Sequence, residues 1–406
     1  MRRKRSAIQA SQLAPQTFTM SSSHGHVSIS APSPETADVI TVTKPIWMPT
    51  MWGRVLRQPK SAPEDISSKL FGPGVIRAAI ANATRLPSKL MSMPGSVAAG
   101  RVRVGLPQGG SRMKIGLCFP YTQDTLTREI TLEWFRRVDE GPFSTLSCGE
   151  RMVGSSVDMM ATLAAAAAVT ERVRIVPTLY ILPMHPALKV AKHAATLDMI
   201  SGGRTTITVG VGGRPQDYRC MEKEPVRRYA RMDEQVAQIR AAWAGELPFE
   251  GAEPIGPAVV QPGGPPILAG SMGPKSIARA AKWADGVYSW SGNGVRDEMK
   301  EQQERVLAAW DAAGRTEAPQ RVAGFWYCLA PNADEQLKAY VYKYIKIFGE
   351  PAAKAMAGRV DRSNPDAVRA SLDAYEELGV EECWLNSATA EIAEIDALLE
   401  VMEKRG

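Results

Sequence analysis

Two glycine-rich turns, each directly after a short apolar stretch, have the clearest capacity for binding chemistry in this chain. They are Gly210-Val211-Gly212-Gly213-Arg214 and Gly270-Ser271-Met272-Gly273-Pro274. Glycine lets a ligand approach the backbone and leaves N–H groups free for an anion, while Ser271 adds a hydroxyl. A helix expected from Pro274 would add further N–H groups. The two turns together indicate a phosphate cradle, although glycine after a strand most often makes only a tight turn.

Neither turn matches a nucleotide-binding fingerprint. Neither is a Walker loop, and Gly210-Val211-Gly212 lacks the third glycine of a dinucleotide motif. The five cysteines are scattered and the chain has only four histidines, so no metal site is predicted. The spacings also support no Ser–His–Asp triad or carboxylate pair.

Other candidate side chains follow predicted strands. Glu150 and Arg151 come after the second strand, and they are either a solvated ion pair or an acid and an anion-binding cation in a pocket. Trp290 ends the sixth strand, where it either lines a flat aromatic pocket or packs against loops. His185 precedes Pro186 and is interpreted as a residue at a helix start rather than a base.

The apolar pattern predicts eight strand–helix units after Met113. The expected strands are 114–119, 144–148, 173–181, 205–209, 266–269, 286–289, 321–329 and 382–385. This alternation predicts parallel pairing and favours a (β/α)8 TIM barrel over an open doubly wound sheet. Wider spacings after the fourth and seventh strands predict loop insertions or added helices at the rim, and active sites of such barrels lie at the carboxyl ends of the strands.

The third predicted strand contains Pro177, which lacks the N–H that a central strand needs. Either the strand begins later than the pattern suggests, or the chain forms a deliberate bulge over 177–180 that brings backbone to a ligand face.

Charge divides the chain into two parts. Residues 1–112 carry fifteen Lys or Arg and four acidic residues, whereas the remainder is net acidic. The Ser-, Pro- and Gly-rich leader predicts a disordered basic extension. It has the composition of a transit peptide, but we favour a true start at Met113 with the leader upstream of it. For residues 113–406 we expect a cytoplasmic location and no nucleic-acid or membrane partner.

Three blocks of sequence resemble the bacterial-luciferase-like monooxygenase family, which includes F420-dependent oxidoreductases. They are TERVRIVPTLYILPMHPALKVAKHAATLDMISGGRTTITVGVGGRPQDY, RYARMDEQVAQIRAAW and PPILAGSMGPKSIARAAKWADGVYSW. The resemblance implies a reduced flavin, FMN or coenzyme F420, across the strand ends. Its cofactor contacts would be Thr178, Leu179, Gly210, Gly212, Gly213, Gly270, Ser271 and Trp290.

The resemblance assigns particular roles and shows two departures. The Gly270-Ser271 turn would hold the flavin phosphate, and Thr178-Leu179 matches a third-strand bulge that is often a non-prolyl cis peptide. Arg151 stands where many members carry histidine, so the usual proton donor is missing. Val211 stands where true luciferases carry arginine, which argues against light emission.

We therefore predict a flavin-dependent oxidoreductase acting on a small organic substrate. It is either a monooxygenase supplied by a separate flavin reductase or an F420-dependent hydride-transfer enzyme, with Glu150 and Arg151 as catalytic candidates. Two alternatives stay open: a non-catalytic flavin-storage protein, and a flavin-free lyase or isomerase of a phosphorylated substrate. A homodimer is the oligomer considered, and the loops 219–227 and 247–262 leave the substrate unspecified.

Overall fold

The computed structural model describes residues 112–405, in which strands and helices alternate. The strands are β1 (Lys114–Cys118), β2 (Thr145–Cys148), β3 (Arg174–Pro177), β4 (Tyr180–Ile181), β5 (Ile207–Gly210), β6 (Ile267–Gly270), β7 (Gly286–Trp290), β8 (Gln320–Tyr327) and β9 (Glu382–Ser387). The helices are α3 (Arg128–Glu140), α4 (Met159–Val169), α5 (Ala187–Ile200), α6 (Pro215–Cys220), α7 (Arg228–Trp243), α8 (Pro274–Ala280), α9 (Arg296–Ala312), α10 (Ala333–Ile345), α11 (Glu350–Ala357), α12 (Pro365–Glu377) and α13 (Ala393–Glu403), with 3-10 turns η1 (Leu182–Met184) and η2 (Lys346–Phe348). The predicted extension, apart from Arg112, lies outside the described residues.

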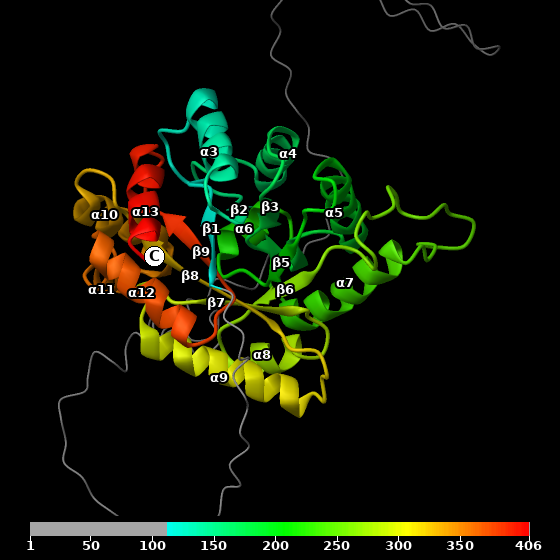
Figure 1. Cartoon of the computed structure of the whole chain (residues 1–406). Helices are drawn as coiled ribbons and strands as arrows, with labels where there is room; N and C mark the ends of the chain where they lie inside the picture. The colour runs from blue at the N-terminus through cyan, green and yellow to red at the C-terminus, as the bar shows by residue number, and fades with distance from the viewer. Residues whose placement is uncertain (1–111, 406) are drawn as a thin grey trace, which may run out of the picture. The chain divides into compact units, whose positions relative to one another are not determined.

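The strands form one parallel sheet in the order β3-β2-β1-β9-β8-β7-β6-β5-β4. β3 and β4 are two parts of one strand, since only Thr178 and Leu179 separate them, and the peptide bond between these two residues is cis. β3 pairs with β2, β4 pairs with β5, and a bridge joins Ile175 to Thr205. The sheet therefore closes on itself, and the helices surround it (Figure 1). The predicted (β/α)8 barrel is confirmed.

The third barrel strand is interrupted directly after Pro177, within the range 177–180 that the sequence predicted. Pro177 ends β3 opposite Cys148 of β2, and the Thr178 N–H donates to the Cys148 carbonyl at 2.7 Å. The alternative of a later strand start is wrong, because β3 already begins at Arg174. Tyr180 then resumes the ladder on the other side, with β5.

Five large side chains from five strands fill the inside of the barrel. They are Val176, Leu268, Tyr288, Val322 and Trp384. Two glycines leave room for these large side chains. A methyl group at Gly116 would lie 2.7 Å from Cδ1 of the fully buried Trp384, and one at Gly324 would lie 2.5 Å from the Tyr288 hydroxyl. The barrel interior is thus a packed core with no central channel.

A polar cluster closes the amino-terminal end of the barrel. The Glu382 carboxylate, 3% exposed, accepts hydrogen bonds at 2.5 Å from the hydroxyls of Ser144 and Thr145. It also pairs with the Arg174 guanidinium. These residues come from or beside β2, β3 and β9, so the cluster links three strands at the end opposite the predicted active site.

Helix starts follow ordinary capping chemistry. The side chains of Thr127, Asp158 and Asn364 accept backbone N–H groups at the first turns of α3, α4 and α12, which satisfies donors that a helix start leaves unpaired. Pro186 occupies the cap position before α5, which begins at Ala187.

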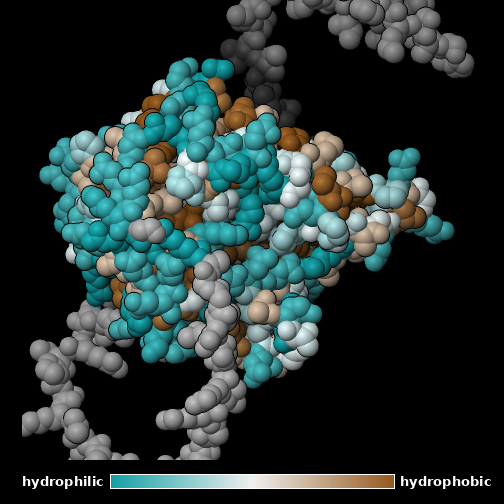
Figure 2. Space-filling view, viewed as in Figure 1, coloured by the Kyte–Doolittle hydropathy of each residue, from teal (hydrophilic) through white to brown (hydrophobic). Residues whose placement is uncertain are grey.

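The two wide strand spacings contain added elements, as predicted. α6, α7 and the segment 244–266 lie between β5 and β6, while α10, α11 and α12 lie between β8 and β9. Figure 2 shows a mostly hydrophilic face, with apolar atoms in its hollows and on the part that projects beyond α7. Within the segment 244–266, the exposed large apolar residues are Leu247, Phe249 and Val260. Within 112–405, none of the helices has the length and apolar character needed to cross a bilayer.

The tight packing around Trp384 can be tested at Gly116. A methyl group there would lie 2.7 Å from both Thr145 Cβ and Trp384 Cδ1. We expect Gly116→Ala to lower the free energy of unfolding by roughly 1–3 kcal/mol, the usual effect of an overpacked core. Chemical denaturation measures this change. The control is Gly256→Ala, whose added methyl meets no atom within 4 Å; equal losses in the two variants would contradict the packing described.

Candidate active site

The two glycine-rich turns lie side by side at the carboxyl end of the barrel. β5 and β6 pair in parallel with Val209 opposite Ala269, so Gly210 and Gly270 are the next residues on each strand. The Leu179 side chain lies against both. A methyl group at Gly210 would lie 2.8 Å from the Leu179 side chain, and one at Gly270 would collide with it. The predicted neighbourhood of the two turns is therefore confirmed, and Leu179 joins them.

In the first turn, two backbone carbonyl groups are occupied and two backbone N–H groups are available. The Tyr218 hydroxyl donates to the Val211 carbonyl at 2.7 Å, and the Arg228 guanidinium donates to the Gly212 carbonyl at 3.0 Å. Gly212 has a φ of +60°, a conformation that favours glycine. No described residue accepts a hydrogen bond from the N–H of Gly212 or Gly213. This loop therefore offers donors at the barrel mouth.

The second turn adds a hydroxyl group. Ser271 is 5% exposed, and its N–H donates to the Tyr288 carbonyl at 3.3 Å. None of the residues in 112–405 forms a hydrogen bond with its hydroxyl. Since α8 has only seven residues, the hydroxyl and the neighbouring loop backbone, rather than a long helix dipole, are the polar groups that this turn offers.

Asp217, which the sequence did not identify, connects two loops of the mouth. Its carboxylate is fully buried and accepts the N–H groups of Met152 and Val153, at 3.2 and 2.9 Å. The Arg214 guanidinium donates to the same carboxylate at 3.0 Å. The loop after β2 and the turn after β5 are therefore held together, which positions both relative to the barrel.

Glu150 and Arg151 point to different surroundings, so the alternative in which they form an ion pair with each other does not apply. Glu150 Oε2 accepts the Ile181 N–H at 2.6 Å, and Oε1 lies 2.7 Å from His185 Nε2. Both side chains are largely buried, and the ring of Tyr180 meets that of His185 edge-on. Glu150 thus ties the end of β2 to the end of β4. His185, interpreted only as a residue at a helix start, is its partner.

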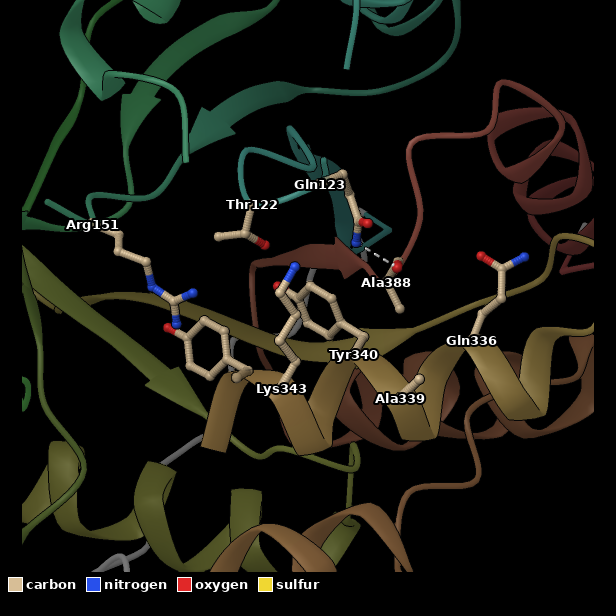
Figure 3. Close-up of a pocket in the computed structure, with 9 residues that line it drawn as sticks. Thr122, Gln123, Arg151, Gln336, Ala339, Tyr340, Lys343 and Ala388 are labelled. Carbon is tan, nitrogen blue, oxygen red and sulfur yellow. Dashed lines mark hydrogen bonds between the residues drawn. The ribbon is translucent and has the colours of Figure 1, made fainter. Parts of the chain in front are cut away.

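Arg151 instead lines a cavity of about 250 Å³ beside α10. Its guanidinium carbon lies 4.6 Å from the centre of the Tyr344 ring, and its Nη2 is buried without a hydrogen-bond partner in the described part of the chain. Figure 3 shows Thr122 and Gln123 on the opposite side of the cavity from Tyr340.

An aromatic row lies between the barrel interior and this cavity. Trp290 meets Tyr288 and Trp326, with ring centres 6.1 and 5.1 Å apart, and Trp326 meets Tyr344 at 5.3 Å. The predicted cofactor contact Trp290 therefore lies within an aromatic cluster that reaches α10.

Burial keeps the polar groups near the cavity in their neutral forms. It raises the pKa of the Tyr121 and Tyr340 hydroxyls well above the ordinary tyrosine value. It also raises the pKa of the Cys118 thiol to about 12. Among the residues that line the cavity, Arg151 and Lys343 are the basic ones.

One buried acid positions α10. Glu394 Oε2, on α13, accepts the N–H groups of Leu329 and Ala330 at 2.7 Å each, just before α10 begins. Burial raises the pKa of Glu394 to about 7, against the lowering effect of these two hydrogen bonds.

Comparison with known proteins decides the family. The family model described as luciferase-like monooxygenase matches residues 113–394. The chain belongs to this family.

Relatives of this luciferase-like protein differ in what is known of them. An uncharacterized protein of Mycobacterium tuberculosis is 32% identical over 176 residues, which cover 41% of this chain and 61% of the relative. The chain thus matches about three fifths of that relative's length. The solved structure of the monooxygenase RslO1 from Streptomyces bottropensis is 25% identical, covers 72% of this chain and 99% of RslO1, and has a TM-score of 0.59. An F420-dependent secondary alcohol dehydrogenase with an F420–acetone adduct shares the fold at 19% identity, with 72% and 98% coverage and a TM-score of 0.57.

The position of Glu150 in the luciferase-like barrel predicts a structural effect. In Glu150→Ala the buried Ile181 N–H would lose its acceptor. We expect the free energy of unfolding to fall by roughly 1–3 kcal/mol, measured by thermal or chemical denaturation. Glu253→Ala, at an exposed position, serves as the control. If Glu150→Ala is as stable as this control, the link between β2 and β4 is not as described.

Glu394 predicts a pH dependence of stability. Its folded pKa of about 7 exceeds the ordinary 4.5, so the folded state binds this proton more tightly than the unfolded chain. The contribution of Glu394 to the free energy of unfolding is therefore full below pH 4.5, and it is lost as the pH rises through about 7. Relative to Glu394→Gln, the wild type should lose roughly 1–3 kcal/mol across this range. Denaturation curves at several pH values measure the difference, and a flat or rising difference contradicts the account.

Proposed function

We propose that this luciferase-like protein is an oxidoreductase that binds FMN or F420 at the carboxyl end of the barrel. One observation carries the proposal: the turns after β5 and β6 are neighbours, and both contact Leu179 at the interruption of the third strand. Free N–H groups at Gly212 and Gly213 and the Ser271 hydroxyl fit a phosphate. When bound, the reduced cofactor supplies the electrons for the reaction.

The residues of the chain then have binding and positioning roles. The first turn and Ser271 would hold the phosphate. The Leu179 side chain packs against both turns and keeps them in place. Asp217 keeps the turn after β5 beside the loop after β2. The aromatic row from Tyr288 to Tyr344 excludes water from the side of the mouth that faces α10.

A catalytic role for Arg151 is part of the proposal, and Glu150 acts by positioning. Arg151 is a permanent cation beside the cavity, so it can orient a bound anion but cannot act as a proton donor at neutral pH. Both Glu150 oxygens are already engaged, by Ile181 and His185. We propose that a separate reductase supplies reduced FMN if the reaction consumes O2.

The phosphate assignment is tested with Ser271→Ala. The variant should bind FMN about 5- to 10-fold more weakly, the loss expected from one hydrogen bond, because its hydroxyl would contact the phosphate. Riboflavin, which has the same ring system without the phosphate, is the matched control ligand, and its affinity should not change. Fluorescence titration measures both. An equal loss for FMN and riboflavin would show that Ser271 does not contact the phosphate.

The same purified protein separates the competing functions. FMN, reduced FMN and F420 are titrated, and NADPH-coupled O2 uptake with a flavin reductase is followed on a broad substrate panel. Binding with substrate-dependent turnover is the expected result. Binding without turnover favours flavin storage, and failure to bind any of the three cofactors favours a flavin-free lyase or isomerase.

A further inference from the structure

The cavity beside α10 is separate from the two glycine-rich turns. Its lining comes from the chain after β1, β2 and β9 and from one face of α10: Thr122, Gln123, Arg151, Gln336, Ala339, Tyr340, Lys343, Tyr344 and Ala388. None of these residues belongs to the turns after β5 and β6. Two of them are basic and none is acidic. The lining of the cavity is therefore positively charged. The cavity is also separate from the groups proposed to hold the cofactor phosphate.

Arg151 provides an unsatisfied donor in this cavity. Its Nη2 is buried and has no hydrogen-bond partner within residues 112–405. A guanidinium group keeps its charge at any ordinary pH, and buried donors are nearly always paired. The acidic side chains nearby are engaged elsewhere: Glu150 with Ile181 and His185, and Asp124 with Lys343 at 2.7 Å. Within residues 112–405, Arg151 Nη2 is therefore a buried donor that is available to an acceptor in the cavity.

The walls of the cavity suit a flat molecule. Tyr340 and Tyr344 are stacked with ring centres 6.0 Å apart and an interplanar angle of 29°, and Tyr344 also carries the Arg151 guanidinium on its face. Trp326 packs behind both tyrosines. Figure 3 shows the Arg151 side chain reaching toward α10, with Thr122 and Gln123 across the cavity from Tyr340.

We propose that this cavity binds the substrate, and that the substrate is a planar aromatic or conjugated carboxylate. Its carboxylate would accept a charge-assisted hydrogen bond from Arg151, and its flat body would lie among the tyrosines. Lys343 is exposed at the cavity edge and forms a salt bridge with Asp124. Its positive charge would attract the anion from solution. The inference rests on the proposed function, since it names the substrate class of that same site.

Benzoate tests the proposal directly, with the uncharged benzamide as its matched partner. Binding to the full chain is measured by calorimetry. The wild type should bind benzoate at least about 10-fold more tightly than benzamide, because charge-assisted hydrogen bonds are about twice as strong as neutral ones. Arg151→Gln should weaken benzoate binding about 10- to 100-fold and leave benzamide binding nearly unchanged. Equal affinity of the wild type for the two ligands would overturn the proposal.

Two further variants guard against misfolding and nonspecific charge effects. Arg151→Lys keeps the charge but not the planar fork, so benzoate affinity should lie between that of the wild type and Arg151→Gln. Arg136→Gln removes an exposed arginine on α3 that pairs with Glu133, and its benzoate affinity should equal that of the wild type. If Arg136→Gln weakens benzoate as much as Arg151→Gln, the cavity is not the site.

Competition with the cofactor separates this proposal from the proposed function. FMN and F420 are titrated into the protein with and without saturating benzoate. The expected result is simultaneous binding, with FMN affinity unchanged in Arg151→Gln. Displacement of benzoate by either cofactor would assign the cavity to that cofactor and overturn the substrate proposal, while leaving cofactor binding intact. Benzoate binding without any cofactor binding would instead overturn the proposed function, and the cavity would then be a carboxylate-binding site without a role as a substrate site of a flavin or F420 enzyme.

Discussion

Contact between the Leu179 side chain and two glycines is the interaction on which the rest of the site depends. The third strand stops after Pro177 and resumes at Tyr180. Of the two residues between them, Leu179 packs where Gly210 and Gly270 have no side chains. A Cβ at either glycine would meet Leu179 too closely. The third, fourth and fifth barrel units are therefore fitted to one another at the mouth, and this fit keeps the two turns side by side.

The opposite part of the mouth is built by different means. There the insertion between β8 and β9 supplies α10, and Glu394 of α13 fixes its start through the N–H groups of Leu329 and Ala330. The aromatic row carries this arrangement down to Tyr288 inside the barrel. The two glycine-rich turns are thus built on β5 and β6, whereas the aromatic side of the cavity is built on the insertion between β8 and β9. In a barrel of this kind, a change in the insertion between β8 and β9 can alter the cavity beside α10 while the two glycine-rich turns stay the same.

Much of the barrel follows from sequence because its signals are local. The β-branched and apolar runs mark the strands, and the unusual Pro177 marks the interruption of the third one. The neighbourhood of Gly212 and Ser271 follows from the strand order alone. Contacts between distant residues are not encoded locally in this way. His185 meets Glu150 across 35 residues, and Asp217 reaches back 65 residues to Met152. Likewise, Tyr344 of α10 lies against the Arg151 guanidinium from a distant part of the chain, a contact that no spacing reveals.

The central claim is that the turns after β5 and β6 hold the phosphate of a flavin-type cofactor. A crystal structure of the protein with bound FMN tests it most directly. The account predicts phosphate oxygens within hydrogen-bond distance of the Gly212 and Gly213 N–H groups and the Ser271 hydroxyl. A phosphate bound at Arg151, or at the Glu382 end of the barrel, would contradict it.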